Sequence, residues 1–148
     1  MRRLIAIAAA GGVVVAAGGC SSLPAWQAPA DAKTVQVTLP ERGHVSACIA
    51  DKPYRLEPDA KGNVSLPVDE RVTLWTFLAW SGSFVNFSCY PATSFVPRAG
   101  QGYTMVLEVE PENQSCTFRP YRQTTANRTG LDFEPSIGPA VAYACKKP

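Results

Sequence analysis

Tyr103-Thr-Met-Val-Leu-Glu-Val-Glu110 is the stretch of sequence that decides the fold class. Large apolar side chains occupy every second position from Tyr103 to Val109, and most of the positions between them are polar or charged. Because the side chains of a β-strand alternate between its two faces, this pattern predicts a strand with one buried and one solvated face. Turn-forming residues follow at 111–114, and a second β-rich run begins at residue 115.

Similar short runs occupy the rest of the chain from residue 34 onward. We expect strands at 34–39, 45–50, 54–56, 64–68, 72–79, 84–90, 103–110, 115–122 and 141–145. Pro, Gly, Asn and Asp separate these runs, no segment has a helical period, and the polar segment 124–130 is expected to be a mobile loop. Runs at intervals of about 8–12 residues predict an all-β fold, a single small β-sandwich of about seven to eight strands over residues 34–148.

The composition limits both the size and the partners of the protein. The chain has 148 residues with 14 Lys+Arg, 12 Asp+Glu and one His, and 46% of its residues are hydrophobic. This length fits one domain, and this apolar fraction excludes a chain that is disordered throughout. Without Arg2 and Arg3 the basic and acidic residues are equal in number (14 − 2 = 12 against 12), so we expect no nucleic-acid partner. One His and no Cys-x-x-Cys spacing argue against a metal site, and the absence of nucleotide-binding glycine motifs argues against a cofactor.

Residues 1–19 have the features of an export signal. Two arginines precede an apolar run, and small residues at 17–19 end it. This order of charge, apolar run and small residues is typical of a secretory signal peptide. The apolar run is shorter than the roughly 20 residues that a membrane-spanning helix needs, so we expect the segment to be removed.

Residues 17–20, Ala-Gly-Gly-Cys, resemble the lipobox of bacterial lipoproteins, in which small residues precede an obligatory Cys. The resemblance implies that the chain is cut before Cys20, that its thiol receives a diacylglycerol and that its amino group is acylated, for example with palmitate. Ser21 in place of Asp resembles the class held at the outer membrane, facing the periplasm. Residues 20–33, rich in Pro and Ala, are expected to form a flexible tether, with Trp26 at the lipid headgroups, loose, or packed on the domain.

Four cysteines remain after Cys20, namely Cys48, Cys89, Cys116 and Cys145. An even number in an exported chain predicts two disulfides, and three pairings are possible. We favour Cys89–Cys116, which flanks a hairpin-like unit, and Cys48–Cys145, which would tie the C-terminal tail to an early strand. Alternation also points Cys89 and Cys116 towards the apolar faces of their runs.

The segment 88–116 is similar to part of small bacterial envelope lipoproteins that have no assigned activity. The shared features are Ser-Cys-Tyr-Pro at 88–91, Phe-Val-Pro at 95–97, Gly-Tyr at 102–103 and a closing Cys116. The resemblance implies a small disulfide-bonded β domain and no defined activity.

Aromatic residues gather between residues 72 and 90, and they are the strongest candidates for a binding site. If the aliphatic residues of the run 72–79 face the core, Trp75 and Phe77 lie on the opposite face of that strand. We therefore name Trp75, Phe77 and Trp80 as candidate contacts for a partner protein, a glycan or a lipid. The alternative is that a loop or the C-terminal tail covers this face and buries the rings.

Glu108, Glu110 and His44 are the residues from which a hydrolase would have to be built. Paired carboxylates are the equipment of glycoside hydrolysis, but nothing near the two glutamates predicts an apolar pocket around them. A solvated face that discourages edge pairing is the simpler interpretation. His44 has no Ser or Asp partner at a recognised spacing, and Gly-x-Ser-x-Gly is absent. We therefore predict no catalytic residue, and a hydrolase is the function that the sequence favours least.

These observations predict a lipid-anchored protein of the bacterial envelope with a non-enzymatic structural or interaction domain. The alternative is a binding module or inhibitor for a glycan, peptide or enzyme that acts through the aromatic strand face. The expected partners are the membrane, through the lipid anchor, and an envelope protein or glycan.

Overall fold

The computed structural model describes residues 22–81, 86–143 and 145 of the chain. Within them the chain forms eleven β-strands and one 3₁₀ turn, Pro111–Asn113, so the all-β fold class is confirmed. This part of the chain contains no helix with the length and hydrophobicity required to cross a membrane. Cys20 and the expected signal peptide lie outside the described residues.

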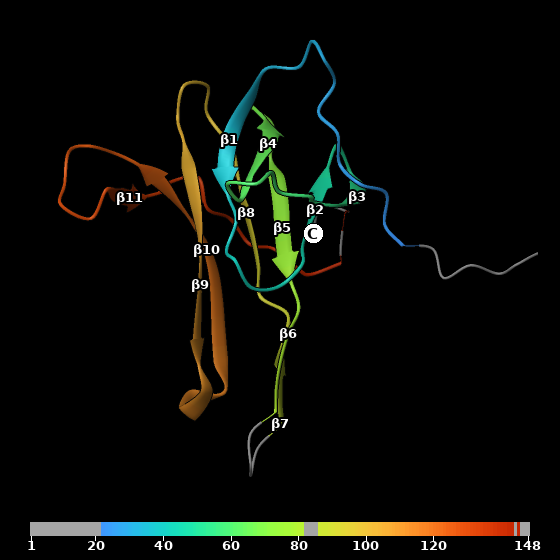
Figure 1. Cartoon of the computed structure of the whole chain (residues 1–148), viewed down its shortest axis with the longest axis vertical. Coiled ribbons are helices and arrows are strands. Elements are labelled where there is room, and N and C mark those ends of the chain that lie inside the picture. Colours follow the sequence, from blue (N-terminus) through green and yellow to red (C-terminus); the bar gives the residue numbers. More distant parts are fainter. Residues whose placement is uncertain (1–21, 82–85, 144, 146–148) are drawn as a thin grey trace, which may run out of the picture.

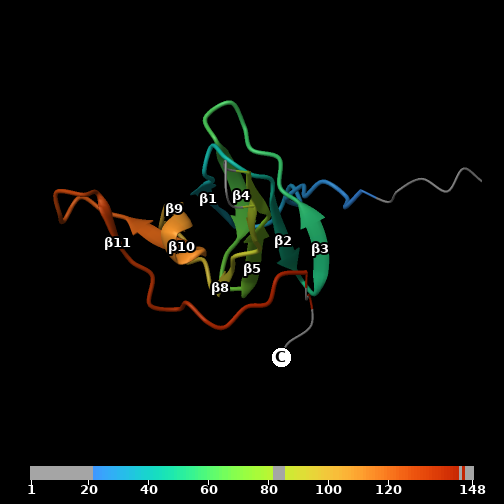
Figure 2. The same cartoon turned by 90° about the horizontal axis from the view of Figure 1, so that it is seen from below.

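Two sheets face each other as a sandwich, and a two-stranded ribbon extends from it (Figure 1). The larger sheet has the order β11-β10-β9-β1-β4, with β1 Thr34–Thr38, β4 Asn63–Pro67, β9 Tyr103–Glu110, β10 Ser115–Gln123 and β11 Leu131–Phe133. The smaller sheet has the order β3-β2-β5-β8, with β2 Val45–Ile49, β3 Lys52–Arg55, β5 Val72–Thr76 and β8 Ala92–Phe95. The ribbon pairs β6 Leu78–Ser81 with β7 Asn86–Cys89. Figure 2 shows the two layers from below.

The core lies between the two sheets and consists of the side chains that alternation places inside. Val37 and Leu66 of the larger sheet and Leu74 and Phe95 of the smaller sheet are completely buried. The rings of Phe95 and Tyr103 meet across the layers, with 5.2 Å between their centroids. Each large apolar side chain buried in this way contributes about 1.5–3 kcal/mol, which makes this double layer the main source of stability.

The first of two long hairpins runs through the smaller sheet and out of it. Strands β5 and β6 pair with β8 and β7 in one register, from Val72 opposite Phe95 to Ser81 opposite Asn86. Phe77 separates β5 from β6 without changing that register, so the strand expected at 72–79 is present but divided.

The second hairpin is β9 with β10, which pair along the whole of β9 and end with Glu110 opposite Ser115. The ends of both hairpins project beyond the sandwich (Figure 1). We call these ends the arms. The first arm is β6–β7, and the second arm is residues 106–110 with 115–119.

Both predicted disulfides are present, which confirms the favoured pairing. Cys89 ends β7 and Cys116 lies near the start of β10, so their disulfide joins the two arms. The other disulfide, Cys48–Cys145, ties the C-terminal tail to β2. The tail also crosses β8, where Ser94 and Gly138 form an isolated bridge.

Three strand assignments depart from the prediction. Residues 92–95 and 131–133 form β8 and β11, whose runs are too short and polar to be recognised. The edge strand expected at 141–145 is wrong, because the described part of that segment contains a turn and no strand. Tyr143 in this segment has a φ of 65°, in the left-handed region, which an extended strand does not adopt.

Part of the expected tether lies against the sandwich. The backbone amide of Trp26 donates to the Arg55 carbonyl (2.8 Å), and the Arg55 amide donates to the Pro24 carbonyl (2.9 Å). The Trp26 ring nitrogen donates to the Ser65 carbonyl at 2.8 Å, and its ring lies 5.1 Å from that of Tyr54. Contact with the domain therefore begins before residue 34.

Candidate functional site

In each hairpin, the side-chain alternation of the sandwich continues unbroken into the arm. Side chains of a strand alternate and the register of each hairpin is unbroken, so the face that packs the core becomes the face that the arms turn towards each other. Five of the facing side chains of the arms are Leu78, Trp80, Phe87, Leu107 and Val109. All five are at least partly exposed, whereas Phe118, on the same face of β10, is buried like the inner side chains of the sandwich.

A cleft of about 670 Å³ lies between the arms. These five side chains line it together with Ala79. Residues 40–42 (Pro-Glu-Arg), which follow β1 and its pairing with the sandwich end of β9, also line it. The volume lies within the range of about 300–1,000 Å³ typical of ligand sites. Apolar walls with two charged residues, Glu41 and Arg42, at one end suit a ligand or segment that is largely apolar.

The segment between β1 and β2 leaves both arms with a free strand edge. β1 pairs with β9 at Val37–Tyr103 and Thr38–Thr104. Residues 39–44 then cross to the smaller sheet, where β2 pairs with β5 and not with β6. Within the part of the chain that the structure describes, β6 and the arm portion of β9 therefore each pair with a strand on one side only.

The outer face of the first hairpin carries a second group of aromatic rings. Phe77 stacks on Tyr90 with 4.7 Å between ring centroids, and Tyr90 meets Tyr143 of the tail at 5.6 Å. We call these three exposed residues the aromatic platform. Desolvation raises the pKa of Tyr143, and the neighbouring Tyr90 adds to the rise.

The three aromatic residues named from the sequence lie in three different environments. Trp75 is 2% exposed because the tail covers it, with the Tyr143 ring 5.8 Å away. Phe77 is 45% exposed on the platform, and Trp80 is 50% exposed in the cleft. The single aromatic face expected from the sequence is thus divided. Side chains alternate along a strand, so Trp80 points to the opposite face from Trp75 and Phe77, and the tail covers part of the outer face.

The sequence pattern places Leu107 and Val109 on the inward face of their strand with Tyr103 and Met105. Leu107 does pack partly against the core, but both side chains also line the cleft and are not fully buried. A signal against full burial was present in the strand lengths. β9 and β10 contain eight and nine residues, whereas β1 and β4 contain five each. A hairpin much longer than its neighbours in the sheet must project beyond them, and its apolar face then lacks a complete opposing layer.

The residues considered for catalysis do not line the cleft. Glu108 and Glu110 project from the opposite face of β9, where Glu108 accepts a hydrogen bond from the Thr117 hydroxyl (3.2 Å) and Glu110 accepts one from the Asn113 amide (2.9 Å). His44 is exposed on the crossing segment. Among the described residues, no three or more His, Cys, Asp or Glu side chains gather in a way that could hold a metal ion.

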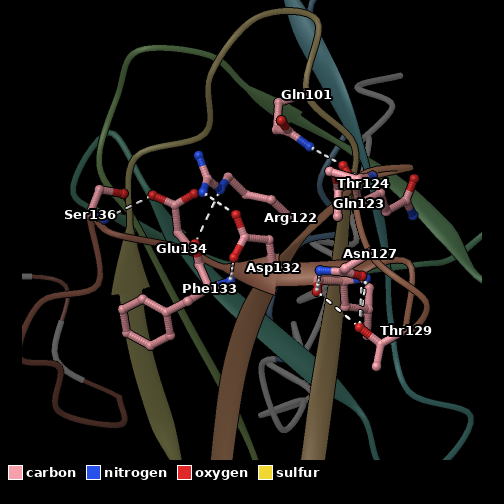
Figure 3. Close-up of polar contacts among 12 residues, drawn as sticks. Gln101, Arg122, Gln123, Thr124, Asn127, Thr129, Asp132, Phe133, Glu134 and Ser136 are labelled. Atoms are coloured by element: carbon pink, nitrogen blue, oxygen red, sulfur yellow. Dashed lines mark hydrogen bonds and ion pairs between the residues drawn. The ribbon is translucent and has the colours of Figure 1, made fainter.

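A polar cluster at the far end of β10 fixes the start of the tail (Figure 3). Arg122 donates to the Asp132 carboxylate (2.7 Å) and to the Phe133 carbonyl (3.1 Å). The buried Glu134 accepts a hydrogen bond from the Ser136 amide at 2.8 Å. These contacts hold β11 and the tail on the sandwich, and they lie outside the cleft.

Comparison with known proteins gives no match: no family model matches the sequence, and no curated protein or solved structure is significantly similar to it. Function is therefore inferred from the cleft, the arms and the platform.

Proposed function

We propose that the protein is a lipid-anchored envelope protein whose β domain is a binding module, and that its binding site is the cleft between the arms. The observation that carries this proposal is an apolar cleft between two hairpin ends that Cys89–Cys116 joins. Apolar side chains left in contact with water in a group are typical of interaction sites. A partner that covered Leu78, Trp80 and Val109 would bury the face that the fold leaves open.

The proposed location is supported by the N-terminal sequence and by the disulfides. Residues 17–20 resemble a lipobox, and disulfides persist in oxidising compartments such as the periplasm. The arms extend from a different side of the sandwich than the one where the described chain begins (Figure 1). An anchor at Cys20 would therefore leave the cleft accessible to a partner.

Capture from crosslinked cells tests the binding site. We expect the acylated wild-type protein to capture a partner that Trp80→Ala fails to capture. Phe133→Ala is the matched control, because Phe133 is 54% exposed on β11, away from the cleft. A partner that persists with Trp80→Ala, or that is lost equally with both variants, would contradict the cleft as the site.

Membrane fractionation tests the anchor separately. We expect Cys20→Ser to release the protein from membranes or to leave an unprocessed precursor, because a serine cannot receive the thioether-linked lipid. Metabolic labelling with a palmitate analogue gives the direct readout. Unchanged labelling in Cys20→Ser would refute a lipid at this residue.

A second candidate function rests on the aromatic platform. Stacked, exposed rings offer flat apolar surfaces on which the apolar face of a sugar ring can lie, so an envelope glycan is the alternative ligand. Binding to isolated envelope polysaccharide would then be lost with Phe77→Ala and retained with Trp80→Ala. The reverse pattern would exclude the platform.

A further inference from the structure

The arm portion of β9 presents a strand edge to solvent. Residues 106–110 pair with β10 on one side, and β1, which flanks the upper part of β9 on the other side, ends at Thr38. Alternate residues of a strand direct their backbone N–H and C=O groups to each side, so this edge offers both donors and acceptors. A strand added in line with β1 would form main-chain hydrogen bonds with it.

The position of this edge decides which side chains an added strand would need on its inner face. Every second side chain would point into the cleft, because side chains alternate along a strand. There they would lie beside Leu107 and Val109 and face Trp80 and Phe87 of the other arm. This face of the added strand must therefore be apolar.

The outer face of the same edge is acidic. Glu108 and Glu110 are exposed and form no ion pair with any described residue. Opposite charges across a strand pair stabilise a sheet, whereas like charges directly opposite each other destabilise it. A second copy of this chain paired through β9 would set glutamates against glutamates, while a partner with Lys or Arg on this face would complement them.

We propose that the free edge of β9 binds an extended segment of a partner protein as an added β-strand, with apolar side chains directed into the cleft and basic side chains between them beside Glu108 and Glu110. This inference rests on the proposed function and names the partner class for the same cleft. The recognised pattern is an alternation of apolar and polar residues with Lys or Arg at one or more of the polar positions. Main-chain hydrogen bonds hold the added strand on β9, and the cleft and the two glutamates determine which side chains that strand must carry.

Selection from a randomised ten-residue peptide library on the immobilised, disulfide-bonded domain tests this pattern. We expect the enriched peptides to alternate apolar and polar residues and to carry Lys or Arg among the polar ones. We expect Glu108→Gln/Glu110→Gln to weaken their binding about three- to tenfold, in line with the strength of cross-strand charge pairs. Glu70→Gln, an exposed carboxylate outside the arms, is the matched control and should leave binding unchanged.

Peptide N-methylation tests strand addition itself. Methylating one alternate set of amides removes the donors that face β9, and methylating the other set removes donors that face solvent. We expect the first set to abolish binding and the second to preserve it, and we expect the bound peptide to slow amide exchange in residues 106–110. Equal binding by both methylated peptides, no enrichment, or enrichment without alternation would overturn the proposal.

The same measurements distinguish a peptide strand from other molecules that could occupy the cleft. A single-chain phospholipid that displaces no bound peptide, and that binds the wild-type domain but not Trp80→Ala, would indicate an amphiphile in the cleft. Protection of residues 106–110 that rises with concentration of the free domain would indicate a second copy. Either result without peptide enrichment overturns strand addition but leaves the cleft as the binding site. Capture of a partner in cells that does not depend on Trp80 overturns the proposed function itself.

Discussion

Leu74 and Leu78 lie on the same face of the same hairpin, four residues apart, and only Leu74 is completely buried. The same contrast separates Phe95 in the sandwich from Phe87 in the arm. Register and alternation are identical in both halves of the hairpin, so they determine only the face that a side chain occupies. Burial depends on whether neighbouring strands and an opposing sheet cover that face, and the arms have fewer of both.

The two halves also differ in what stabilises them. In the part of the chain that the structure describes, the sandwich half has nine strands in two layers, whereas each arm has two strands. A two-stranded hairpin is marginally stable by itself, so the Cys89–Cys116 disulfide is expected to help to hold the arms. We therefore expect variants to affect the two halves in different ways.

Removing each disulfide should give the largest effects. Cys48→Ala/Cys145→Ala opens a loop whose ends are 97 residues apart and should cost up to about 4.7 kcal/mol of unfolding free energy in the chain-entropy treatment. Cys89→Ala/Cys116→Ala, with a separation of 27, should cost up to about 3.5 kcal/mol. Chemical denaturation measures both values.

Amide exchange distinguishes the two disulfides by location. Without Cys89–Cys116, exchange should accelerate in β6, β7 and residues 106–110 and stay slow in β1 and β2. Without Cys48–Cys145, the tail should leave the outer face and Trp75 should become accessible to a fluorescence quencher. Equal acceleration in both halves after loss of the arm disulfide would contradict the division into sandwich and arms.

Truncating the matched leucines should give the next effect. Leu74→Ala removes a completely buried side chain and should lower the unfolding free energy by about 3 kcal/mol, because it leaves a cavity in a packed core. Leu78→Ala removes a partly exposed side chain and should cost about 1 kcal/mol or less. If denaturation curves gave equal costs, the arm would be packed as tightly as the core.

Alkaline pH should affect the sandwich half through Tyr103. Burial raises the pKa of its hydroxyl, the nearby Glu134 adds to the rise, and the hydrogen bond from the Arg98 amide (3.0 Å) opposes it. Below a pH of about 10 the hydroxyl is protonated in both states, and above it the unfolded chain loses the proton first. Stability should then fall by up to about 1.4 kcal/mol per pH unit until the pH passes the raised pKa of the folded state.

Tyr103→Phe removes this titration and gives the control. The variant should lose about 1 kcal/mol at neutral pH, from the hydrogen bond, and should show a shallower decline above pH 10. Denaturation at a series of pH values measures the slope. An unchanged slope in the variant would assign the alkaline loss to other groups.

The smallest effect on stability should come from Trp80→Ala. Because Trp80 is 50% exposed and faces the cleft, its loss should change the unfolding free energy by about 0.5 kcal/mol or less, as for Phe133→Ala. Partner capture should nevertheless differ between the two variants. A large loss of stability in Trp80→Ala would mean that the ring holds the arms together.

Much of the fold follows from local sequence patterns. Alternation at 103–110 identifies both the strand and its inner face, and the parity of Cys89 and Cys116 gives the disulfide that the structure contains. These features depend on neighbouring residues in the chain, so a single sequence is enough to read them. The short strand β11, by contrast, forms because its three residues meet the end of β10.

The candidate site depends on contacts that no local pattern encodes. Val109 has the same alternation as Met105 and is therefore expected in the core. Among the described residues, however, no strand extends the sheet beside β9 beyond Thr38, and only the two-stranded first arm faces Val109. Trp75 lies on the face opposite the core, so the local pattern leaves open whether another segment covers it, and the tail held by Cys145 does cover it. Both outcomes are set by where distant segments end or cross, which is a property of the assembled sheets.

Site-specific photocrosslinking in living cells tests the central claim most directly. A benzophenone side chain would replace Phe87 in the cleft or, as the matched control, Phe133 on β11, in the otherwise unchanged acylated protein. If the arms form the binding site, the probe at residue 87 crosslinks to a discrete partner protein through a segment of alternating apolar and polar residues, and the probe at 133 does not. A partner that crosslinks only from residue 133, or equally from both positions, would contradict the account.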